Sequence, residues 1–158
     1  MRRSCRAARE ILEEVALAVV PGVSTGEIDK LAARLISDRG GRSPFLNYRG
    51  FPGHICISVN DEIVHGIGGA RRIQYADIVK LDIGIILHGW VGDTATTIPV
   101  GEIPAATTRL LEKTQEALAV GIEQARAGHR VHHISEAIEN FVVSNGYSVV
   151  REFVGHGV

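Results

Sequence analysis

Two aspartates in a β-rich segment are the residues best suited to chemistry. Asp82 and Asp93 lie 11 positions apart in DIVKLDIGIILHGWVGDTATTIPVG. The β-rich runs 78–87 and 91–100 predict two strands, and the His-Gly pair between them predicts a two-residue turn that joins them as a hairpin. Because Asp82 interrupts an otherwise apolar strand, a purely structural role explains it poorly.

The predicted turn determines which residues face one another across the hairpin. Leu87 would pair with Trp90, which places Asp82 opposite Ala95, on the face that Asp93 shares. The two aspartates then become diagonal neighbours with Cα atoms about 7–8 Å apart. Such a pair can converge on a cation, whereas without one the two like charges repel each other. A bulge would shift this register, and by pattern alone Asp93 can also be an ordinary residue near a turn.

Two histidines next to glycines are further candidates. His156 lies between two glycines in VVREFVGHGV, and His65 precedes a glycine in SVNDEIVHGI. Imidazole is a common ligand of transition metals, and small neighbours leave it room to reach a bound ion. Taken singly, each histidine is more often a polar residue at a strand end, so both interpretations stay open.

Hydrophobic periodicity indicates the helices and strands that would position these residues. A capping box of the S-x-x-E type, at Ser24 and Glu27, marks the start of one helix. The expected helices are 3–19, 25–38, 107–127 and 131–145. The expected strands outside the hairpin are 54–59 and 148–154.

The order of these elements repeats weakly along the chain. Each half has two helices joined by a glycine turn and leads to a His-Gly-aliphatic triplet, at 65–67 and 156–158. We therefore interpret 1–158 as a single domain, with a first pseudo-repeat at 1–100 and a partial second one at 107–158. Only the first repeat continues into a hairpin after its triplet, so we expect the second to lack about 35 residues or more.

The composition excludes several classes of protein. Hydrophobic residues make up 45% and charged residues 22%, which argues against disorder. With 17 basic and 18 acidic residues, there is no basic excess for a nucleic-acid surface. Cys5 and Cys56 are too few for a disulfide scaffold, and no signal peptide or membrane span is evident. We expect a cytoplasmic protein.

Several ordered motifs together resemble the type I methionine aminopeptidases of metallopeptidase family M24. The matching segments are PGVSTGEID at 21–29, NYRGFP at 47–52 with Cys56 soon after, NDEIVHGI with His65, LDIG…GDT with Asp82 and Asp93, and GHG with His156. Creatinase- and prolidase-like relatives fit less well around NYRGFP and VHGI.

The resemblance implies an α+β pita-bread fold, with a curved antiparallel sheet and two helix pairs on its outer face. It implies two divalent ions (Co, Mn, Fe or Zn) held by Asp82, Asp93 and His156, with Asp93 bridging both ions. His65 would donate a hydrogen bond to the substrate amide or the tetrahedral intermediate. The methionine pocket would be lined by Tyr48, Phe51, Cys56 and Phe45.

The implied activity is removal of the N-terminal methionine from nascent polypeptides, by a monomer, with the ribosome as a further candidate partner. Family members have two more metal-binding glutamates, one of them the general base, and a second histidine, all downstream of His156. They also have leading sequence before the position of Met1. We therefore expect a fragment that lacks both ends, is incomplete at its C-terminus and is inactive as printed. The alternative is a metal-free relative that binds nascent chains or ribosomes without cleaving.

Overall fold

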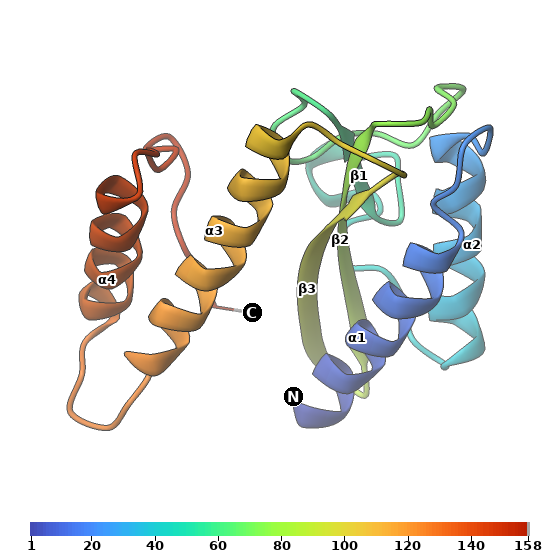
Figure 1. Cartoon of the computed structure of the whole chain (residues 1–158). Coiled ribbons are helices and arrows are strands. Elements are labelled where there is room, and N and C mark those ends of the chain that lie inside the picture. Colours follow the sequence, from blue (N-terminus) through green and yellow to red (C-terminus); the bar gives the residue numbers. More distant parts are fainter. Residues whose placement is uncertain (158) are drawn as a thin grey trace. The chain divides into compact units, whose positions relative to one another are not determined.

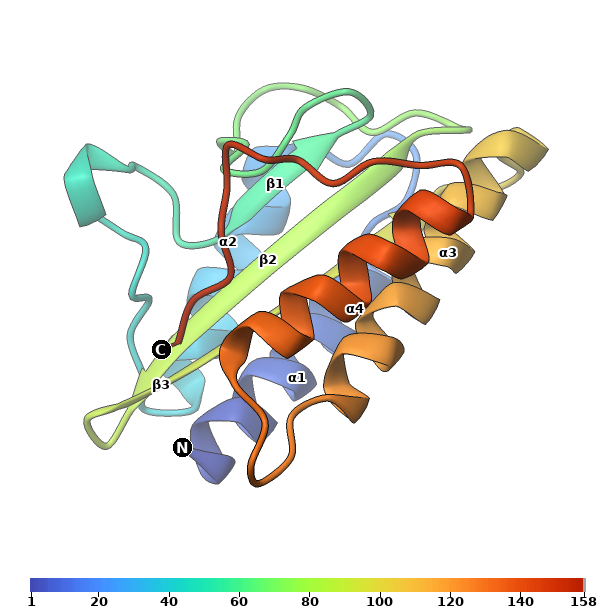
Figure 2. The ribbon, with the colours of Figure 1, turned by 90° about the vertical axis from the view of Figure 1, so that its left-hand side faces the viewer.

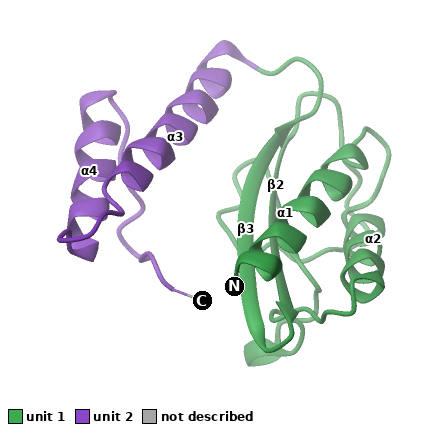
Figure 3. Ribbon diagram, turned by 90° about the horizontal axis from the view of Figure 1, so that it is seen from below, with its two compact units in different colours: residues 1–103, 158 green, residues 104–157 purple. Residues whose placement is uncertain are grey.

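The computed structural model describes residues 1–157 (Figure 1). They divide into two compact units, 1–103 and 104–157 (Figure 3). The elements of the first unit are α1 (Arg2–Leu17), α2 (Thr25–Asp38), the 3-10 helix η1 (Tyr48–Gly50), β1 (Cys56–Val59), β2 (Ile78–Leu87) and β3 (Trp90–Pro99). Those of the second unit are α3 (Ala105–Glu123) and α4 (Val131–Ser144). The α+β class predicted from the sequence is confirmed.

The three strands form one antiparallel sheet in the order β1-β2-β3. At the turn between β2 and β3, His88 and Gly89 both have positive φ, 52° and 80°, as a type I′ hairpin turn requires. Leu87 pairs with Trp90, so the predicted register is confirmed. The short strand expected at 54–59 begins two residues later, at Cys56.

Helices α1 and α2 cover one face of this sheet (Figure 1). Alternate residues of β2 point into the core that they enclose, and all four are fully buried: Val79, Leu81, Ile83 and Ile85. The start of α1 lies directly over Gly92 of β3, where a Cβ atom would come within 2.4 Å of the backbone of Ser4. The other face of the sheet, which contains both aspartates, is therefore not needed for the core.

The predicted capping box at the start of α2 is confirmed. The backbone N–H of Glu27 donates to Ser24 Oγ at 3.2 Å, and the N–H of Ser24 donates to Glu27 Oε2 at 2.8 Å. Hydrogen bonds from the side chain and backbone of Ser24, in that order, hold the pKa of Glu27 below its ordinary value of 4.5. The helix therefore begins where the sequence predicts.

The second unit consists of two helices that pack side by side (Figure 2). Gly121 permits their close approach, since a Cβ atom there would lie 2.7 Å from Ile138 Cδ1. The strand predicted at 148–154 is wrong, because residues 147–157 form neither helix nor strand. A strand requires a neighbour to satisfy its backbone groups, and the described part of this unit has only helices. None of the helices within 1–157 has both the length and the apolar composition needed to cross a bilayer.

Candidate metal centre

Asp82 and Asp93 lie on the sheet face opposite α1 and α2. Asp82 pairs with Ala95, and Asp93 pairs with Gly84. In an antiparallel pair this register makes the two aspartates diagonal neighbours, with Cα atoms about 7–8 Å apart. Both residues are half-buried. The hairpin therefore brings two carboxylates to one face, as the alternation of the strands predicts.

Cys56 is the neighbour of Asp82 on the other side of β2. It pairs with Asp82 in the β1–β2 ladder and is 5% exposed. Burial is the main cause that raises the pKa of the Cys56 thiol to about 12, and the charges of Asp82 and then Asp93 act in the same direction. A hydrogen bond with the backbone of His65 opposes them. Cys56 thus lies close to both carboxylates and to His65, with a neutral thiol at physiological pH.

His65 is held beside β1 by the glycine that follows it. Gly66 accepts a hydrogen bond from Ile57 N–H at 2.9 Å and donates one to Ser58 Oγ at 3.0 Å. A Cβ atom on Gly66 would come within 2.2 Å of Ile57 O, so only glycine fits there. Val64 and His65 have φ of 39° and 54°, which is unfavourable for residues with a Cβ atom. Local strain next to the two carboxylates supports a functional role for His65.

Phe45 lies against the strand position opposite Asp93. A Cβ atom on Gly84 would lie 2.5 Å from Pro44 Cγ and 2.9 Å from Phe45 Cε1. Ser43 fixes this segment, because its Oγ accepts the N–H of Phe45 at 3.0 Å and donates to His54 O at 2.6 Å. The aromatic ring therefore provides an apolar wall beside the carboxylates.

Tyr48 and Phe51 belong to the same loop as Phe45. Tyr48, in η1, is 63% exposed, and the Arg49 guanidinium lies 5.5 Å from the centroid of its ring. The ring of Phe51 lies over Gly53, where a Cβ atom would be 3.0 Å from Phe51 Cε1. Because the Tyr48 side chain is largely exposed, its place in the pocket stays a prediction.

His156 belongs to the second unit. It is exposed, and its Nδ1 lies 3.0 Å from Gly157 O. Its role as the nitrogen ligand stays a prediction, because His156 belongs to a different compact unit from Asp82 and Asp93. Within residues 1–157, no three metal-ligating side chains already form a cluster. The donor chemistry nevertheless fits a divalent transition metal, since carboxylates and imidazole both bind such ions.

Asp29 and His54 were not singled out in the sequence, although they support the loop that contains Phe51. The carboxylate of Asp29 accepts the backbone N–H of His54 at 2.7 Å and that of Ile55 at 3.0 Å. The sequence did indicate that Asp29 lies on the inner side of its helix. Asp29 follows the buried residue Ile28 and lies one turn after buried Thr25. A carboxylate on the buried side of an amphipathic helix predicts a polar partner.

Asp77, a buried aspartate that directly precedes β2, was also not singled out in the sequence. Asp77 is 8% exposed and accepts hydrogen bonds from Gln74 N–H and Asn60 Nδ2, both at 2.8 Å. Asn60 O in turn accepts a hydrogen bond from Lys80 Nζ, on the strand face that contains Asp82. Burial lowers the pKa of Lys80. The start of β2 is thus fixed by a polar network as well as by the apolar packing of Val79.

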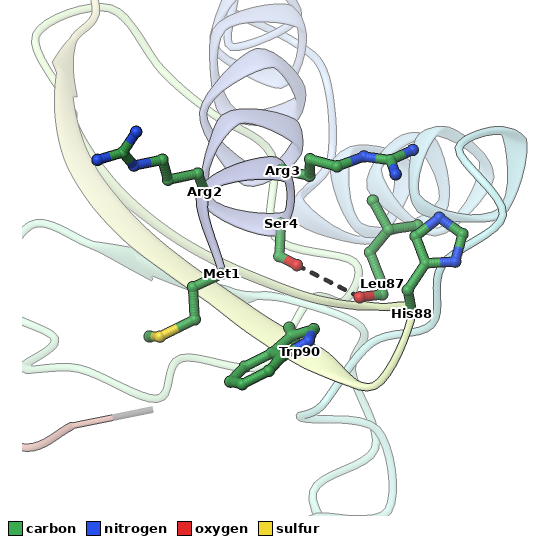
Figure 4. A pocket seen from close by; sticks show the side chains of 7 residues that line it. All are labelled: Met1, Arg2, Arg3, Ser4, Leu87, His88 and Trp90. Atoms are coloured by element: carbon green, nitrogen blue, oxygen red, sulfur yellow. Dashed lines mark hydrogen bonds between the residues drawn. The ribbon is translucent and has the colours of Figure 1, made fainter.

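A hollow of about 290 Å³ lies at the far end of the hairpin, beside the start of α1 (Figure 4). Its lining residues are Met1, Arg2, Arg3, Ser4, Leu87, His88 and Trp90. Ser4 Oγ donates to Leu87 O across its floor at 3.4 Å. Neither aspartate lines this hollow, so it is separate from the candidate metal centre.

The chain is similar in sequence to proteins named methionine aminopeptidase. The chain is 46% identical over 158 residues to methionine aminopeptidase 1 of Bacillus subtilis (strain 168), which is all of this chain and 64% of the relative. It is 38% identical to methionine aminopeptidase of Escherichia coli (strain K12), over 61% of that relative. The chain therefore spans less than two thirds of the length of these relatives.

Solved structures give the same result for the fold. The crystal structure of methionine aminopeptidase from Rickettsia prowazekii matches with a TM-score of 0.97 and 36% identity, covering 99% of this chain and 63% of that one. The Xaa-Pro dipeptidase from Bacillus anthracis matches with a TM-score of 0.81 at 22% identity, which supports the fold alone. The predicted pita-bread fold is confirmed. Because the model of metallopeptidase family M24 matches every residue from 1 to 158, the chain belongs to that family.

Proposed function

We propose that the protein, at its full natural length, is a metal-dependent aminopeptidase that removes the N-terminal methionine from polypeptides. The observation that supports this most is the pair Asp82 and Asp93, diagonal on one sheet face with Cys56 beside them. Membership of a metallopeptidase family and similarity to proteins named methionine aminopeptidase agree with it. A binding protein without catalytic activity would not need two carboxylates on that face.

Asp82 and Asp93 would hold two divalent ions (Co, Mn, Fe or Zn), with Asp93 between the two and His156 as a nitrogen ligand. When bound, such ions lower the pKa of water and polarise a carbonyl group, which is the chemistry that peptide hydrolysis needs. Carboxylate and imidazole donors are compatible with each of these metals, so the donor set does not select one of them.

The remaining site residues would bind and orient the substrate. His65 would donate a hydrogen bond to the substrate amide or to the tetrahedral intermediate, in which negative charge develops on the oxygen of the attacked carbonyl. The neutral Cys56 thiol, Phe45 and Phe51 would surround an unbranched thioether side chain, with Tyr48 at the pocket entrance. A protonated thiol suits this role, because a thiolate would place a third negative charge beside the carboxylates.

The proposal extends to the setting of the enzyme. We propose one catalytic domain with pseudo-repeats at 1–100 and 107–158, acting as a monomer in the cytoplasm and meeting nascent chains at the ribosome. The family resemblance supports these points. Sedimentation equilibrium of the purified protein tests whether it is a monomer. Cosedimentation with ribosomes tests whether it binds them.

Substitution of Asp93 tests the proposed function. In the protein at full natural length, Asp93→Asn should reduce hydrolysis of Met-Ala-Ser by on the order of a thousandfold and lower the number of bound ions, measured by calorimetric titration with Mn²⁺. Asp38→Asn, at an exposed position near the end of α2, should change neither. Unchanged metal stoichiometry in Asp93→Asn would exclude the bridging role, and failure of the unsubstituted protein to cleave methionyl peptides would exclude the activity.

A further inference from the structure

The carboxylate of Asp29 holds two consecutive residues that precede β1. Its Oδ1 accepts the backbone N–H of His54 at 2.7 Å and that of Ile55 at 3.0 Å, and its Oδ2 lies 3.1 Å from His54 Nδ1. The side chain of Asp29 is 15% exposed and that of His54 is 35% exposed. One acidic group on α2 thus fixes the backbone of the loop at a partly buried site.

Two glycines bring the backbone close around this carboxylate. A Cβ atom on Gly68 would lie 2.9 Å from Asp29 Cβ, and one on Gly53 would lie 3.4 Å from Asp29 Oδ1. The same Cβ atom on Gly53 would also lie 3.0 Å from the ring of Phe51. The Phe51 ring therefore packs against Gly53, which directly precedes His54 and Ile55, the two residues that Asp29 holds.

His54 is held from its other side as well. Its carbonyl oxygen accepts a hydrogen bond from Ser43 Oγ at 2.6 Å, and the same Oγ accepts the N–H of Phe45 at 3.0 Å. Cys56 begins β1 two residues after His54. Three residues proposed for the substrate pocket are thus connected to the segment that Asp29 fixes: Phe51 by its ring over Gly53, Phe45 through Ser43, and Cys56 as the next residue but one after His54.

We propose that Asp29 is a positioning residue for substrate selection: through residues 53–55 it sets where Phe45, Phe51 and Cys56 present their side chains to the N-terminal residue of the substrate. This inference rests on the proposed function. Asp29 itself touches neither the substrate nor the metal. Its effect appears in the choice between substrates, because a pocket wall that shifts changes the fit of one side chain more than that of another.

The test compares Asp29→Ala with Asp29→Asn in the protein at full natural length. For each variant, kcat and KM are measured for peptides that begin with Met and with Leu. The ratio of the two kcat/KM values does not depend on the fraction of folded protein, so a purely structural defect leaves it unchanged. We expect Asp29→Ala to lower the Met preference by on the order of tenfold, with KM for the Met peptide changing more than kcat. Asp29→Asn retains a carbonyl acceptor and should restore most of the preference.

Asp77→Ala is the matched control, because Asp77 is also a buried acid that accepts backbone and side-chain hydrogen bonds. It should lower stability without changing the ratio. If Asp29→Ala behaves in the same way as Asp77→Ala, the positioning role is excluded.

A second measurement does not depend on activity. In a Cys5→Ser background, Asp29→Ala should increase alkylation of buried Cys56 by iodoacetamide by on the order of tenfold in native buffer, whereas Asp77→Ala should not. Absence of methionyl peptide cleavage by the unsubstituted protein would exclude the proposed function. The alkylation rates alone would then decide whether Asp29 controls the position of the pocket segment. An unchanged alkylation rate would exclude control of the pocket segment by Asp29.

Discussion

Gly84→Ala tests the arrangement of the candidate metal centre with a single methyl group. Gly84 pairs with Asp93, and its backbone is not in the left-handed region, so alanine is sterically allowed by φ and ψ. The added Cβ atom would lie 2.5 Å from Pro44 Cγ and 2.9 Å and 3.0 Å from Cε1 and Cζ of Phe45. Ordinary carbon contacts are about 3.5–4.0 Å, so Pro44 must move by about 1 Å and Phe45 by about half as much.

The segment cannot absorb this shift freely. Ser43 Oγ accepts hydrogen bonds from the N–H groups of Phe45 at 3.0 Å and Leu46 at 3.3 Å, and it donates one to His54 O. Overpacking of this kind costs about 1–3 kcal/mol. Replacement of glycine by alanine returns about 0.5–1 kcal/mol, because it restricts the unfolded chain. We therefore expect Gly84→Ala to lower the free energy of unfolding by about 1–2 kcal/mol.

Urea unfolding followed by the fluorescence of Trp90, the single tryptophan, measures this difference. With an m-value of about 2 kcal/mol/M, the midpoint should fall by about 0.5–1 M at unchanged slope. Gly69→Ala is the control, because a Cβ atom there meets nothing within 4 Å and φ is ordinary. It should be neutral or slightly stabilising. If Gly84→Ala also proves neutral or stabilising, Pro44 and Phe45 do not lie over Gly84, and the apolar wall beside Asp93 is refuted.

Two further predictions concern the capping box and the buried thiol. Ser24→Ala should lower the free energy of unfolding by about 1 kcal/mol in urea titrations at neutral pH, because α2 loses its cap. The lowered pKa of Glu27 means that the folded state favours its charged form, so the part of the stabilisation that depends on this charge is present above pH 4.5 and is lost as the pH falls through the lowered pKa. The difference between the two proteins should therefore narrow in acid, and a constant difference would contradict this. Iodoacetamide at pH 8 should label exposed Cys5 well before Cys56, whose pKa is raised to about 12 by burial, and peptide mass spectrometry showing equal labelling would contradict that order.

Local sequence chemistry was sufficient for the hairpin. A His-Gly turn with two positive φ values and fully buried apolar side chains at alternate positions from Val79 to Ile85 determine the register, and with it the diagonal of Asp82 and Asp93. The helix that starts at Ser24 follows from its capping box for the same reason, since the partners are three residues apart. Hydrogen bonds between residues close in sequence are the part of a fold that can be predicted most directly from a single sequence.

Contacts between distant segments could not be read in this way. Asp29 and His54 are 25 residues apart, and their pairing depends on how α2 packs beside β1. The error at 148–154 has a related cause, because β-propensity does not provide a partner strand. The position of Phe45 could be predicted only in part. Gly84, a glycine inside a strand, indicates that another segment approaches closely, but it does not identify that segment.

The surroundings of the acidic residues suggest which of them can bind a cation. Asp29 and Asp77 direct their oxygens to N–H groups of the protein, and each thereby fixes a loop. Such carboxylates have little capacity left for a metal ion. Asp82 and Asp93 share one sheet face beside Cys56, where burial and then the charges of Asp82 and Asp93 raise the pKa of its thiol. We therefore expect substitution of Asp29 to alter substrate choice and substitution of Asp93 to alter metal binding.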